Sequence, residues 1–504
     1  LYANYNRKIG EDFELGAMVG HSFLKTRSRT SYIDAQNYPS PAFDVASVAA
    51  NIVDASAGLS EYAIESYFAR LSLAYKDRYV VNATIRTDGS SRFAPDCRWG
   101  WFPSVSVGWN VSNESFWNAE KTDLKIRASY GRTGNQDGIS NYGWQALISG
   151  GVNYGGQSGI AISSSGNDRL TWETADQYNA GFDLSFLGGK INMIADVYLK
   201  NTNNLLYSKP VHATTGETSI LSNIGSMRNK GVEFTINTHL NLGKVLWSSS
   251  FNIARNVNKL TSLLEDDLLS IGANRALKLG RTVGSWYIFR TDGIYQYDGE
   301  VPQALYDKGV RAGDVKYWDR NGDGNITDDD RIVTGNPNPK FSGGWNNTFK
   351  YKGLELSLFF TYSYGNDVYA SWMIHGSKPG YTRSLLKAYA DNRWTGPGTS
   401  DKYPRAIYSY SGWNGKNSTM YLTDGSFIRL RSVTLGYTFP QRLVSKIHLK
   451  GLRVYAQGDN VFLCSRYPGW DPETSVNLDP RFYGEDNDGV PQPRIFKLGV
   501  NITF

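Results

Sequence analysis

The sequence has no long apolar run, little sulfur and few histidines. Among 504 residues there are only 2 Cys, 5 Met and 5 His. A membrane-spanning helix needs about 20 consecutive apolar residues, and the most apolar stretches, such as LELSLFF at 354–360, are far shorter. A helical membrane protein is therefore excluded. The chain also has no nucleophile elbow, HExxH motif or Cys ligand cluster, so nothing in it supports catalysis, and we expect no enzyme.

Charge of one sign is not concentrated either. The formal net charge is +6, and Lys and Arg are scattered along the chain, which gives no case for nucleic-acid binding.

Cys97 and Cys464 could form a disulfide in an oxidising compartment, but sequence does not fix connectivity. We expect both in loops that lie far apart around the fold.

Aromatic residues and glycine are abundant instead. Aromatics make up 14% of the chain, with 33 Tyr and 14 Trp, and there are 52 Gly. This composition suits many strands joined by tight turns, with an aromatic belt at a membrane surface. The mean hydropathy of −0.43 does not argue against a membrane barrel, because lipid-facing and polar residues alternate along its wall.

Period-two alternation predicts strands throughout the chain. The clearest segments are 67–76, 78–86, 190–200, 230–240 and 353–362. In the second of these, one face carries Tyr79, Val81, Ala83 and Ile85, and the other carries Arg78, Asn82, Thr84 and Arg86. Each segment therefore has one apolar and one polar face.

The connections between these strands fall into two alternating classes. Short turns are expected near 75–78, 186–190, 240–245 and 350–353, with medium ones near 111–123 and 438–450. Long connections are expected near 25–60, 133–170, 201–228, 256–340, 363–425 and 460–493, with a shorter one at 88–99. Turns on one rim and loops on the other are typical of outer-membrane barrels. A string of soluble β-sandwiches would show linkers between modules instead.

The final segment predicts a last strand that ends in an aromatic residue. Its apolar face consists of Phe496, Leu498, Val500, Ile502 and Phe504. Counting back gives about fifteen strands, and outer-membrane transporters of the plugged class have about 22. We therefore expect an all-β transmembrane antiparallel barrel in which residues 1–504 form the C-terminal part. The sequence begins without a leader, so the N-terminal plug is expected to precede it.

Five segments, in order along the chain, resemble the SusC-like family of TonB-dependent outer-membrane transporters. They are RYVVNATIRTDGSSRFAPDCRWGWFPSVSVGWNVSNESFW (78–117), LKIRASYGRTGNQDGI (124–139), NIGSMRNKGVEFTIN (223–237), DVKYWDRNGDGNITDDDRIVTGNPNPKFSGGWNNTFKYKGLELSLFF (314–360) and FIRLRSVTLGYTFP (427–440). The resemblance implies import of glycan fragments or oligopeptides across the outer membrane of a Gram-negative cell. It also implies a SusD-like surface lipoprotein as a lid, and energy from TonB, ExbB and ExbD through the N-terminal region.

Two other functions fit parts of the pattern. A siderophore or vitamin receptor has the same architecture without a lid, but the family motifs argue against it. A secreted carbohydrate-binding β-protein would also use aromatic loops.

Cargo residues are expected among loop tryptophans, which could stack on sugar rings or anchor loops against the lid. These are Trp144, Trp286, Trp372, Trp394, Trp413 and Trp470.

The long loop at 256–340 contains a candidate cation site. The segment DRNGDGNITDDD (319–330) has the spacing of a twelve-residue calcium loop, with Gly324 at the sharp turn and Asp330 where a bidentate Glu is usual. The shorter Asp predicts a weak Ca²⁺ site, or one that accepts Mg²⁺. The alternative is a metal-free turn whose side chains cap backbone amides. The expected ligands are Asp319, Asn321, Asp323, Asn325, Thr327 and Asp330.

Overall fold

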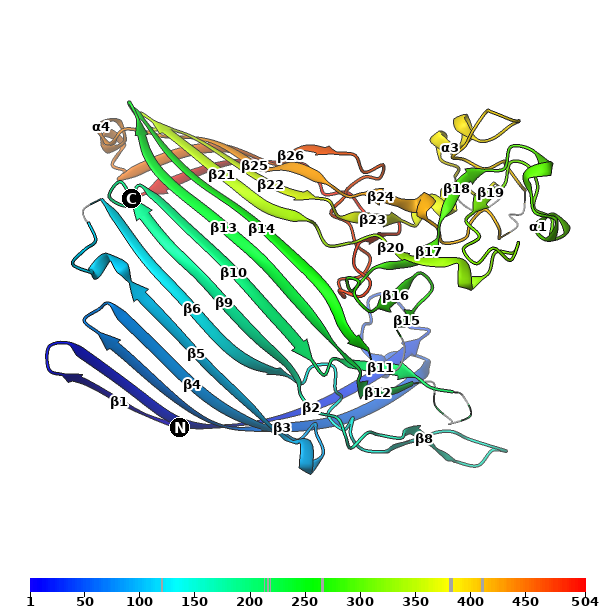
Figure 1. The fold of residues 1–504 in the computed structure, drawn as a ribbon, viewed down its shortest axis with the longest axis horizontal. Coiled ribbons are helices and arrows are strands. Elements are labelled where there is room, and N and C mark those ends of the chain that lie inside the picture. The colour runs from blue at the N-terminus through cyan, green and yellow to red at the C-terminus, as the bar shows by residue number, and fades with distance from the viewer. Residues whose placement is uncertain are drawn as a thin grey trace. The chain divides into compact units, whose positions relative to one another are not determined.

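The computed structural model describes residues 1–118, 121–212, 214, 217, 219–263, 267–379, 384–408 and 412–504. Fifteen strands form one sheet whose order follows the order along the chain (Figure 1). This confirms the predicted all-β class and the expected number of strands. Among the described residues, no helix has the length and apolar character needed to cross a membrane.

The strands of this sheet are joined in sequence order. They are β1 (Tyr2–Ile9), β2 (Phe13–Gln36), β3 (Asn51–Tyr75), β4 (Tyr79–Ser90), β5 (Trp99–Asn110), β6 (Thr122–Asn135), β9 (Glu173–Phe186), β10 (Ile191–Asn203), β13 (Gly225–Leu242), β14 (Val245–Leu263), β21 (Phe341–Tyr351), β22 (Leu354–Tyr364), β25 (Phe427–Thr438), β26 (Gly451–Ser465) and β28 (Ile495–Thr503). The chain divides into two compact units, one of Leu1–Ser115, Ile126–Ala180 and Lys200–Met227, the other of Phe116–Lys125, Gly181–Leu199 and Arg228–Phe504.

The predicted short turns are confirmed. Between β3 and β4, the Arg78 amide donates to the Tyr75 carbonyl at 2.9 Å, and Lys76 and Asp77 have φ of 51° and 52°. Positive φ at both central residues is typical of the type I′ turn, whose twist matches that of the strands it joins. Lys352 and Gly353 repeat this geometry between β21 and β22.

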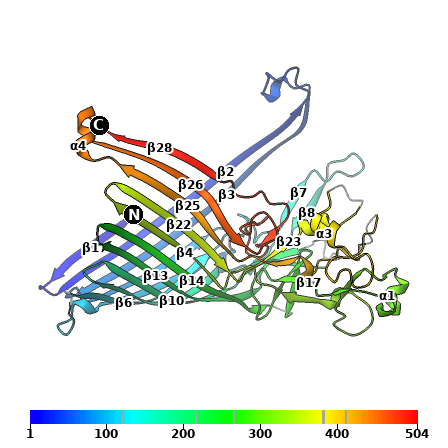
Figure 2. The ribbon, with the colours of Figure 1, turned by 90° about the horizontal axis from the view of Figure 1, so that it is seen from above.

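The predicted long loop at 25–60 is wrong in its bounds. Strands β2 and β3 stay paired from Phe13↔Tyr75 to Gln36↔Asn51, which leaves a loop of residues 37–50. Figure 2 shows this ribbon continuing past the end of β4, whose last residue pairs with Ile64. The Ser-rich composition suggested a loop, but Thr, Tyr and Ile in this stretch favour strands. The two strands also form hydrogen bonds with each other's backbone N–H and C=O groups.

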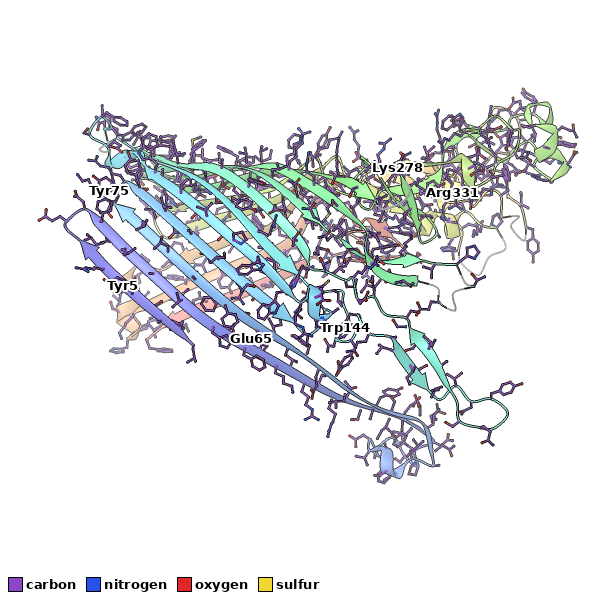
Figure 3. The ribbon with its side chains drawn as sticks, turned by 60° about the horizontal axis from the view of Figure 1, so that its bottom comes forward. Tyr5, Glu65, Tyr75, Trp144, Lys278 and Arg331 are labelled. Carbon is purple, nitrogen blue, oxygen red and sulfur yellow. The ribbon has the colours of Figure 1, made fainter. Side chains whose placement is uncertain are left out.

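Strands β3 to β5 have one apolar and one polar face. Leu71, Ile85 and Val105 lie on the exposed apolar face. At the turn end, rings stack from strand to strand, with centroids 6.4 Å apart for Tyr75–Tyr79 and 6.3 Å for Tyr79–Trp109. Figure 3 shows Tyr75 at that end of β3 and Glu65 farther along the strand.

A second aromatic contact lies on the same face toward the loop end of the strands. The Tyr67 and Trp99 centroids are 6.1 Å apart. Tyr67 and Tyr75 are eight residues apart on β3, about 26 Å along a strand. An apolar band between two aromatic girdles, on a scale of about 25 Å, matches the lipid-facing surface of an outer-membrane barrel.

The long connections are folded, which composition did not predict. In the first unit they contain the hairpins β7 (Leu147–Gly150) with β8 (Ile160–Ser164) and β11 (Leu206–Pro210) with β12 (Ser219–Asn223). In the second unit they contain β15 (Leu268–Ile271), β16 (Arg275–Lys278), β17 (Trp286–Phe289), β18 (Thr291–Ile294), β19 (Val315–Tyr317), β20 (Arg331–Thr334), β23 (Asp367–Ala370), β24 (Leu422–Asp424) and β27 (Glu485–Asp486).

In the described part of the chain, helices are short and lie in the connections between strands. The α-helices are α1 (Gln303–Asp307), α2 (Trp372–Gly376), α3 (Lys387–Asn392) and α4 (Gln441–Val444). The 3₁₀ turns are η1 (Ala46–Val48), η2 (Pro95–Cys97), η3 (Val111–Asn113), η5 (Asp298–Glu300), η6 (Asp328–Asp330), η7 (Thr419–Tyr421) and η8 (Ser445–Ile447).

Arg275 joins separate loops of the second unit. It is 0% exposed, its guanidinium lies 4.1 Å from the Trp286 ring centroid, and Nη2 donates to the Tyr483 carbonyl at 3.0 Å. Nη1 donates to the Gly284 carbonyl. Burial lowers the pKa of Arg275 to about 10, so the side chain stays charged at neutral pH and holds three segments together.

The two cysteines are not joined. Cys97 and Cys464 are free thiols, and the structure corrects the placement of Cys464, which lies in β26 and not in a loop.

Candidate functional site

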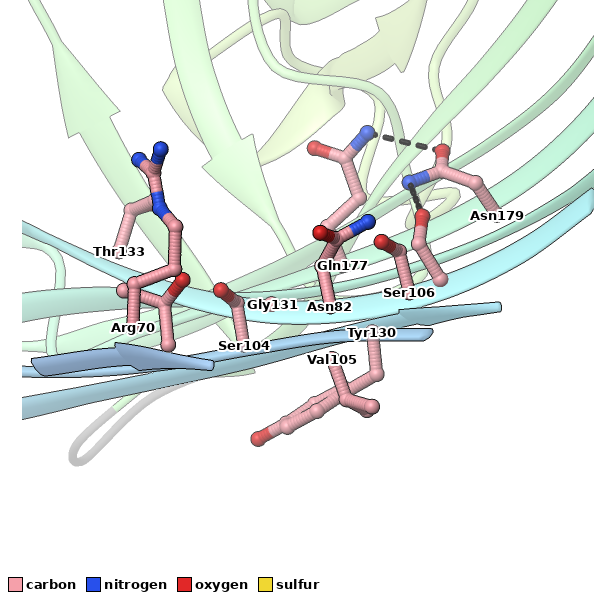
Figure 4. A pocket seen from close by; sticks show the side chains of 12 residues that line it. Arg70, Asn82, Ser104, Val105, Ser106, Tyr130, Gly131, Thr133, Gln177 and Asn179 are labelled. Carbon is pink, nitrogen blue, oxygen red and sulfur yellow. Dashed lines mark hydrogen bonds between the residues drawn. The ribbon is translucent and has the colours of Figure 1, made fainter. Parts of the chain in front are cut away.

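Two pockets bring together residues from different elements. The first, which we name the wall pocket, lies on the polar face of the sheet in the first unit and has a volume of about 440 Å³. Figure 4 shows Val105 and Tyr130 pointing away from the polar side chains. The polar lining consists of Arg70, Asn82, Thr84, Ser104, Ser106, Ser129, Thr133, Gln177 and Asn179.

Alternation along the strands builds the wall pocket. Asn82 and Thr84 are two residues apart on β4, and Ser104 and Ser106 are two apart on β5, so each pair shares a face. Gln177 Nε2 donates to Asn179 Oδ1 at 3.0 Å. The predicted polar face of segment 78–86 is thereby confirmed at Asn82 and Thr84.

The second pocket, which we name the loop pocket, lies in the folded loops of the second unit. Its volume is about 520 Å³, within the usual range for small-ligand sites. Two of its walls come from a Pro-Gly-Trp turn after β26 and from helix α2. The lining residues are Trp372, Leu386, Pro468, Gly469, Trp470, Asp486, Asp488 and Gly489.

A chain of hydrogen bonds fixes one side of the loop pocket. Trp372 Nε1 donates to the Tyr467 hydroxyl at 3.1 Å, which donates to Asp486 Oδ2 at 2.6 Å. Burial, and then the bond to Asp486, raise the pKa of the Tyr467 hydroxyl, so this hydroxyl stays protonated and acts as a donor. Strand β27 holds Asp486 in place by pairing with β23.

Of the six predicted tryptophans, Trp372 and Trp470 meet in the loop pocket. Trp470 is 78% exposed, whereas Trp286 is 0% exposed. Arg275 and Tyr369 cover the Trp286 ring. Trp286 therefore packs in the interior and offers no ring face to a ligand in this structure.

The remaining three tryptophans anchor loops through their indole nitrogens. Trp144 donates to the Ser91 carbonyl at 3.3 Å, Trp394 to Gln296 Oε1 at 3.2 Å and Trp413 to the Val315 carbonyl at 2.9 Å. A cargo contact for them, as for Trp372 and Trp470, stays a prediction.

The acidic segment 319–330 forms a turn rich in side-chain to backbone bonds. Asp319 Oδ1 accepts from the Gly322 amide at 2.7 Å and its Oδ2 from the Gly324 amide at 2.8 Å. The buried Asp330 accepts from the Arg320 and Thr327 amides, both at 2.8 Å. Within the described part of the chain, no three acidic, His or Cys side chains converge as a metal-ligand set. The predicted cation site stays a prediction.

The other predicted ligands of this segment also have polar contacts. Asn321 Nδ2 donates to Asp323 Oδ2 at 3.0 Å, and Asn325 Oδ1 accepts from Lys308 Nζ at 2.8 Å. The Thr327 side chain and Asp330 form a capping box around η6. These contacts fit the metal-free alternative, and a cation would have to share the carboxylate oxygens with them.

Residues 2–461 match the family described as TonB dependent receptor-like, beta-barrel. The chain belongs to this family. TonB-dependent receptor P26 of Formosa agariphila is 33% identical over 525 residues, covering 99% of this chain and 52% of the relative. TonB-dependent receptor SusC of Bacteroides thetaiotaomicron is 29% identical over 530 residues, covering 100% and 50%. The chain thus spans about half the length of the curated relatives it matches.

A solved structure shows the same fold. The chain of the RagAB peptide transporter superposes with a TM-score of 0.86 at 23% identity, covering 100% of this chain and 55% of that chain. The predicted SusC-like resemblance, the barrel class and the outer-membrane location are confirmed. The proteins of this family are receptors and transporters rather than enzymes. That residues 1–504 are the C-terminal part stays a prediction.

Several residues of the loop pocket carry no recognisable signal in the sequence. Leu386, Pro468 and Asp486 lie far apart along the chain and outside any motif, so only the folded loops bring them together. The two tryptophans of the pocket, Trp372 and Trp470, were among the loop tryptophans singled out from the sequence.

Proposed function

We propose that the full-length protein imports an oligomeric nutrient, a glycan fragment or an oligopeptide, across the outer membrane in a TonB-dependent manner. The observation that carries this proposal is the family match over residues 2–461. A relative named SusC and a neighbour titled as a peptide transporter support nutrient import. In this reading the wall pocket lines the inner face of the barrel, and the loop pocket contacts cargo at the cell surface.

We also propose a SusD-like surface lipoprotein as the partner of the loops. Several loop side chains in each unit are large, apolar and strongly exposed. Exposed apolar surface of this kind favours a protein partner. These side chains are Tyr154, Ile160 and Ile162 in the first unit and Leu478 and Val490 in the second. The TonB, ExbB and ExbD proteins would supply the energy through the N-terminal region.

Two measurements test these proposals. Cells that express the full-length protein should take up fluorescent oligosaccharides or oligopeptides only when TonB is present, and uptake that persists without TonB would contradict import of this kind. Affinity purification from native membranes, followed by mass spectrometry, should recover a stoichiometric surface lipoprotein. Recovery of the transporter alone would favour a receptor without a lid.

A further inference from the structure

We propose that the loop pocket binds a cationic group of the cargo, an organic ammonium or guanidinium, through Asp486 and the exposed ring of Trp470. This inference rests on the proposed function, since it concerns how imported cargo is recognised. It goes beyond import because it assigns a chemical class of ligand to the loop pocket.

The first step concerns the charge of Asp486. The residue is 3% exposed and lines the loop pocket. Its Oδ2 accepts from the Tyr467 hydroxyl at 2.6 Å and its Oδ1 from the Gly489 amide at 2.8 Å. Both carboxylate oxygens act as acceptors, which is the hydrogen-bonding pattern of an ionised carboxylate. The side of the pocket formed by Asp486 is therefore anionic.

The second step is a comparison with the other carboxylates of the same loop. Four of them pair with arginine, whereas Asp486 contacts only neutral donors among the residues that the structure describes. The four N–O distances are 2.5 Å for Asp471–Arg429, 2.5 Å for Glu473–Arg431, 2.5 Å for Asp479–Arg481 and 3.9 Å for Glu485–Arg275. Among these paired carboxylates only Asp471 is as buried as Asp486, and it has Arg429 beside it, whereas no arginine of the described residues pairs with Asp486.

Energetics favour a cation at this position. A buried charge without a counter-ion is costly, and an opposite charge placed beside it recovers part of that cost. A neutral sugar hydroxyl could also donate to Asp486, but it would leave the charge uncompensated. Because Asp486 has no arginine partner among the described residues, a cationic ligand is favoured over a neutral sugar hydroxyl.

The third step concerns the aromatic wall. Trp470 is 78% exposed and follows Pro468 and Gly469 in a turn that also lines the pocket. A cation over the face of Trp is attracted by the quadrupole of the ring, and Trp binds cations better than Tyr or Phe does. A carboxylate on one side and an indole on the other therefore form a site for an organic cation. Asp488, a second carboxylate, also lines the pocket.

Two kinds of cargo carry such a group. An oligopeptide can present Arg or Lys, and a glycan can present an unacetylated amino sugar. The shared chemistry is a nitrogen cation attached to an oligomer, so the experiment includes both sources and a neutral isostere of each.

The test is calorimetric binding to the intact transporter in detergent. The peptide probes are capped Gly-Ser-Xaa-Ser-Gly peptides with Arg or with neutral citrulline at Xaa. The glycan probes are the glucosamine trimer and its fully N-acetylated form. We expect at least one cationic probe to bind about tenfold or more tightly than its neutral isostere, with an advantage that falls as salt increases.

Two variants assign the preference to the loop pocket. Asp486→Asn keeps the size and acceptor oxygen of the side chain but removes its charge, so the preference for the cation should disappear. Asp479→Asn, in the same loop but outside the pocket, is the matched control and should leave the preference unchanged. Because Asp486 is buried, Trp470→Ala provides a second test at an exposed site, and it should weaken binding of the cationic probe several-fold.

Equal affinity for cationic and neutral probes, no binding of any probe, or a preference that survives both Asp486→Asn and Trp470→Ala would overturn the inference. A stronger affinity for the acetylated trimer would identify a neutral sugar site instead. The TonB-dependent uptake experiment is independent of these measurements. Import without a preference for cations would therefore refute this inference alone, whereas loss of TonB-dependence would refute the proposed function.

Discussion

Arg275 is a single side chain on which three loop segments depend. Replacing it with Met keeps the apolar stem but removes the donors to the Gly284 and Tyr483 carbonyls. A buried carbonyl left without a donor costs about 1–3 kcal/mol. We expect Arg275→Met to lower the free energy of local opening by about 2 kcal/mol, which is about a 30-fold faster amide exchange in segments 274–289 and 482–486.

Hydrogen–deuterium exchange read by mass spectrometry measures this effect. Arg281→Met, at an exposed arginine of the same loop, is the control and should leave exchange in both segments unchanged. Equal exchange in the two variants would mean that the loops are held together by their apolar clusters alone.

The acidic segment 319–330 leads to a second prediction about single residues, which concerns calcium binding. Calorimetry on the intact protein should detect Ca²⁺ binding at about 10⁻⁴–10⁻³ M, the range of extracellular calcium loops. Asp323→Ala should abolish the binding heat, and Asp329→Ala, which removes a neighbouring carboxylate outside the expected ligand set, should not. Heats that are absent, or unchanged by Asp323→Ala, would favour the metal-free turn.

At the scale of the strand, adjacent residues should respond in opposite ways to the same substitution. Val105 lies on the exposed apolar face of β5 and Ser104 lines the wall pocket on the other (Figure 4). An Arg in the middle of the lipid-facing band costs about 2–4 kcal/mol, whereas polar lumen positions tolerate it. We expect Val105→Arg to reduce the folded, heat-modifiable form in outer membranes and Ser104→Arg to leave it near the native level. Similar yields for both variants would contradict the assignment of faces.

Strands were predictable because each carries its own period-two pattern. Tyr79, Val81 and Ile85 alternate with polar residues, and this pattern fixes both the strand and its faces without knowledge of any neighbour. The ribbon of β2 and β3 beyond Ile64 was missed because both of its faces mix Ser, Thr and charged residues, so no apolar face marked it as a strand.

The folded loops could not be predicted in the same way. The cluster around Trp286 and Tyr369 joins residues from three connections, and short strands such as β17 are too brief to show a period. Two predicted tryptophans do share a pocket. Asp486 could not be predicted as part of it, because the pairing of β27 with β23 positions this residue. Sites assembled from distant loop residues leave no local pattern in the sequence.

At the scale of the whole molecule, the edges of the sheet lead to a prediction. Strands β1 and β28 each have one hydrogen-bonded neighbour in the fifteen-stranded sheet. A strand edge in lipid has no water to satisfy its backbone, which makes open sheets unstable there. We expect residues 1–504 expressed alone to give no heat-modifiable monomer in outer membranes, and the full-length protein to give one. A stable monomer from residues 1–504 alone would show that its edges are satisfied without further strands.

The connections between neighbouring strands of the sheet differ widely in length. The connection between β13 and β14 is residues 243–244, and the connection between β14 and β21 is residues 264–340. The entropy lost on closing a loop grows only with the logarithm of its length, at about 0.6 kcal/mol per doubling, so the longer connection costs only about 3 kcal/mol more. An inserted loop that folds on its own core can offset a penalty of that size. The wall can therefore stay constant while its surface loops accept insertions, deletions and exchanges of whole folded segments.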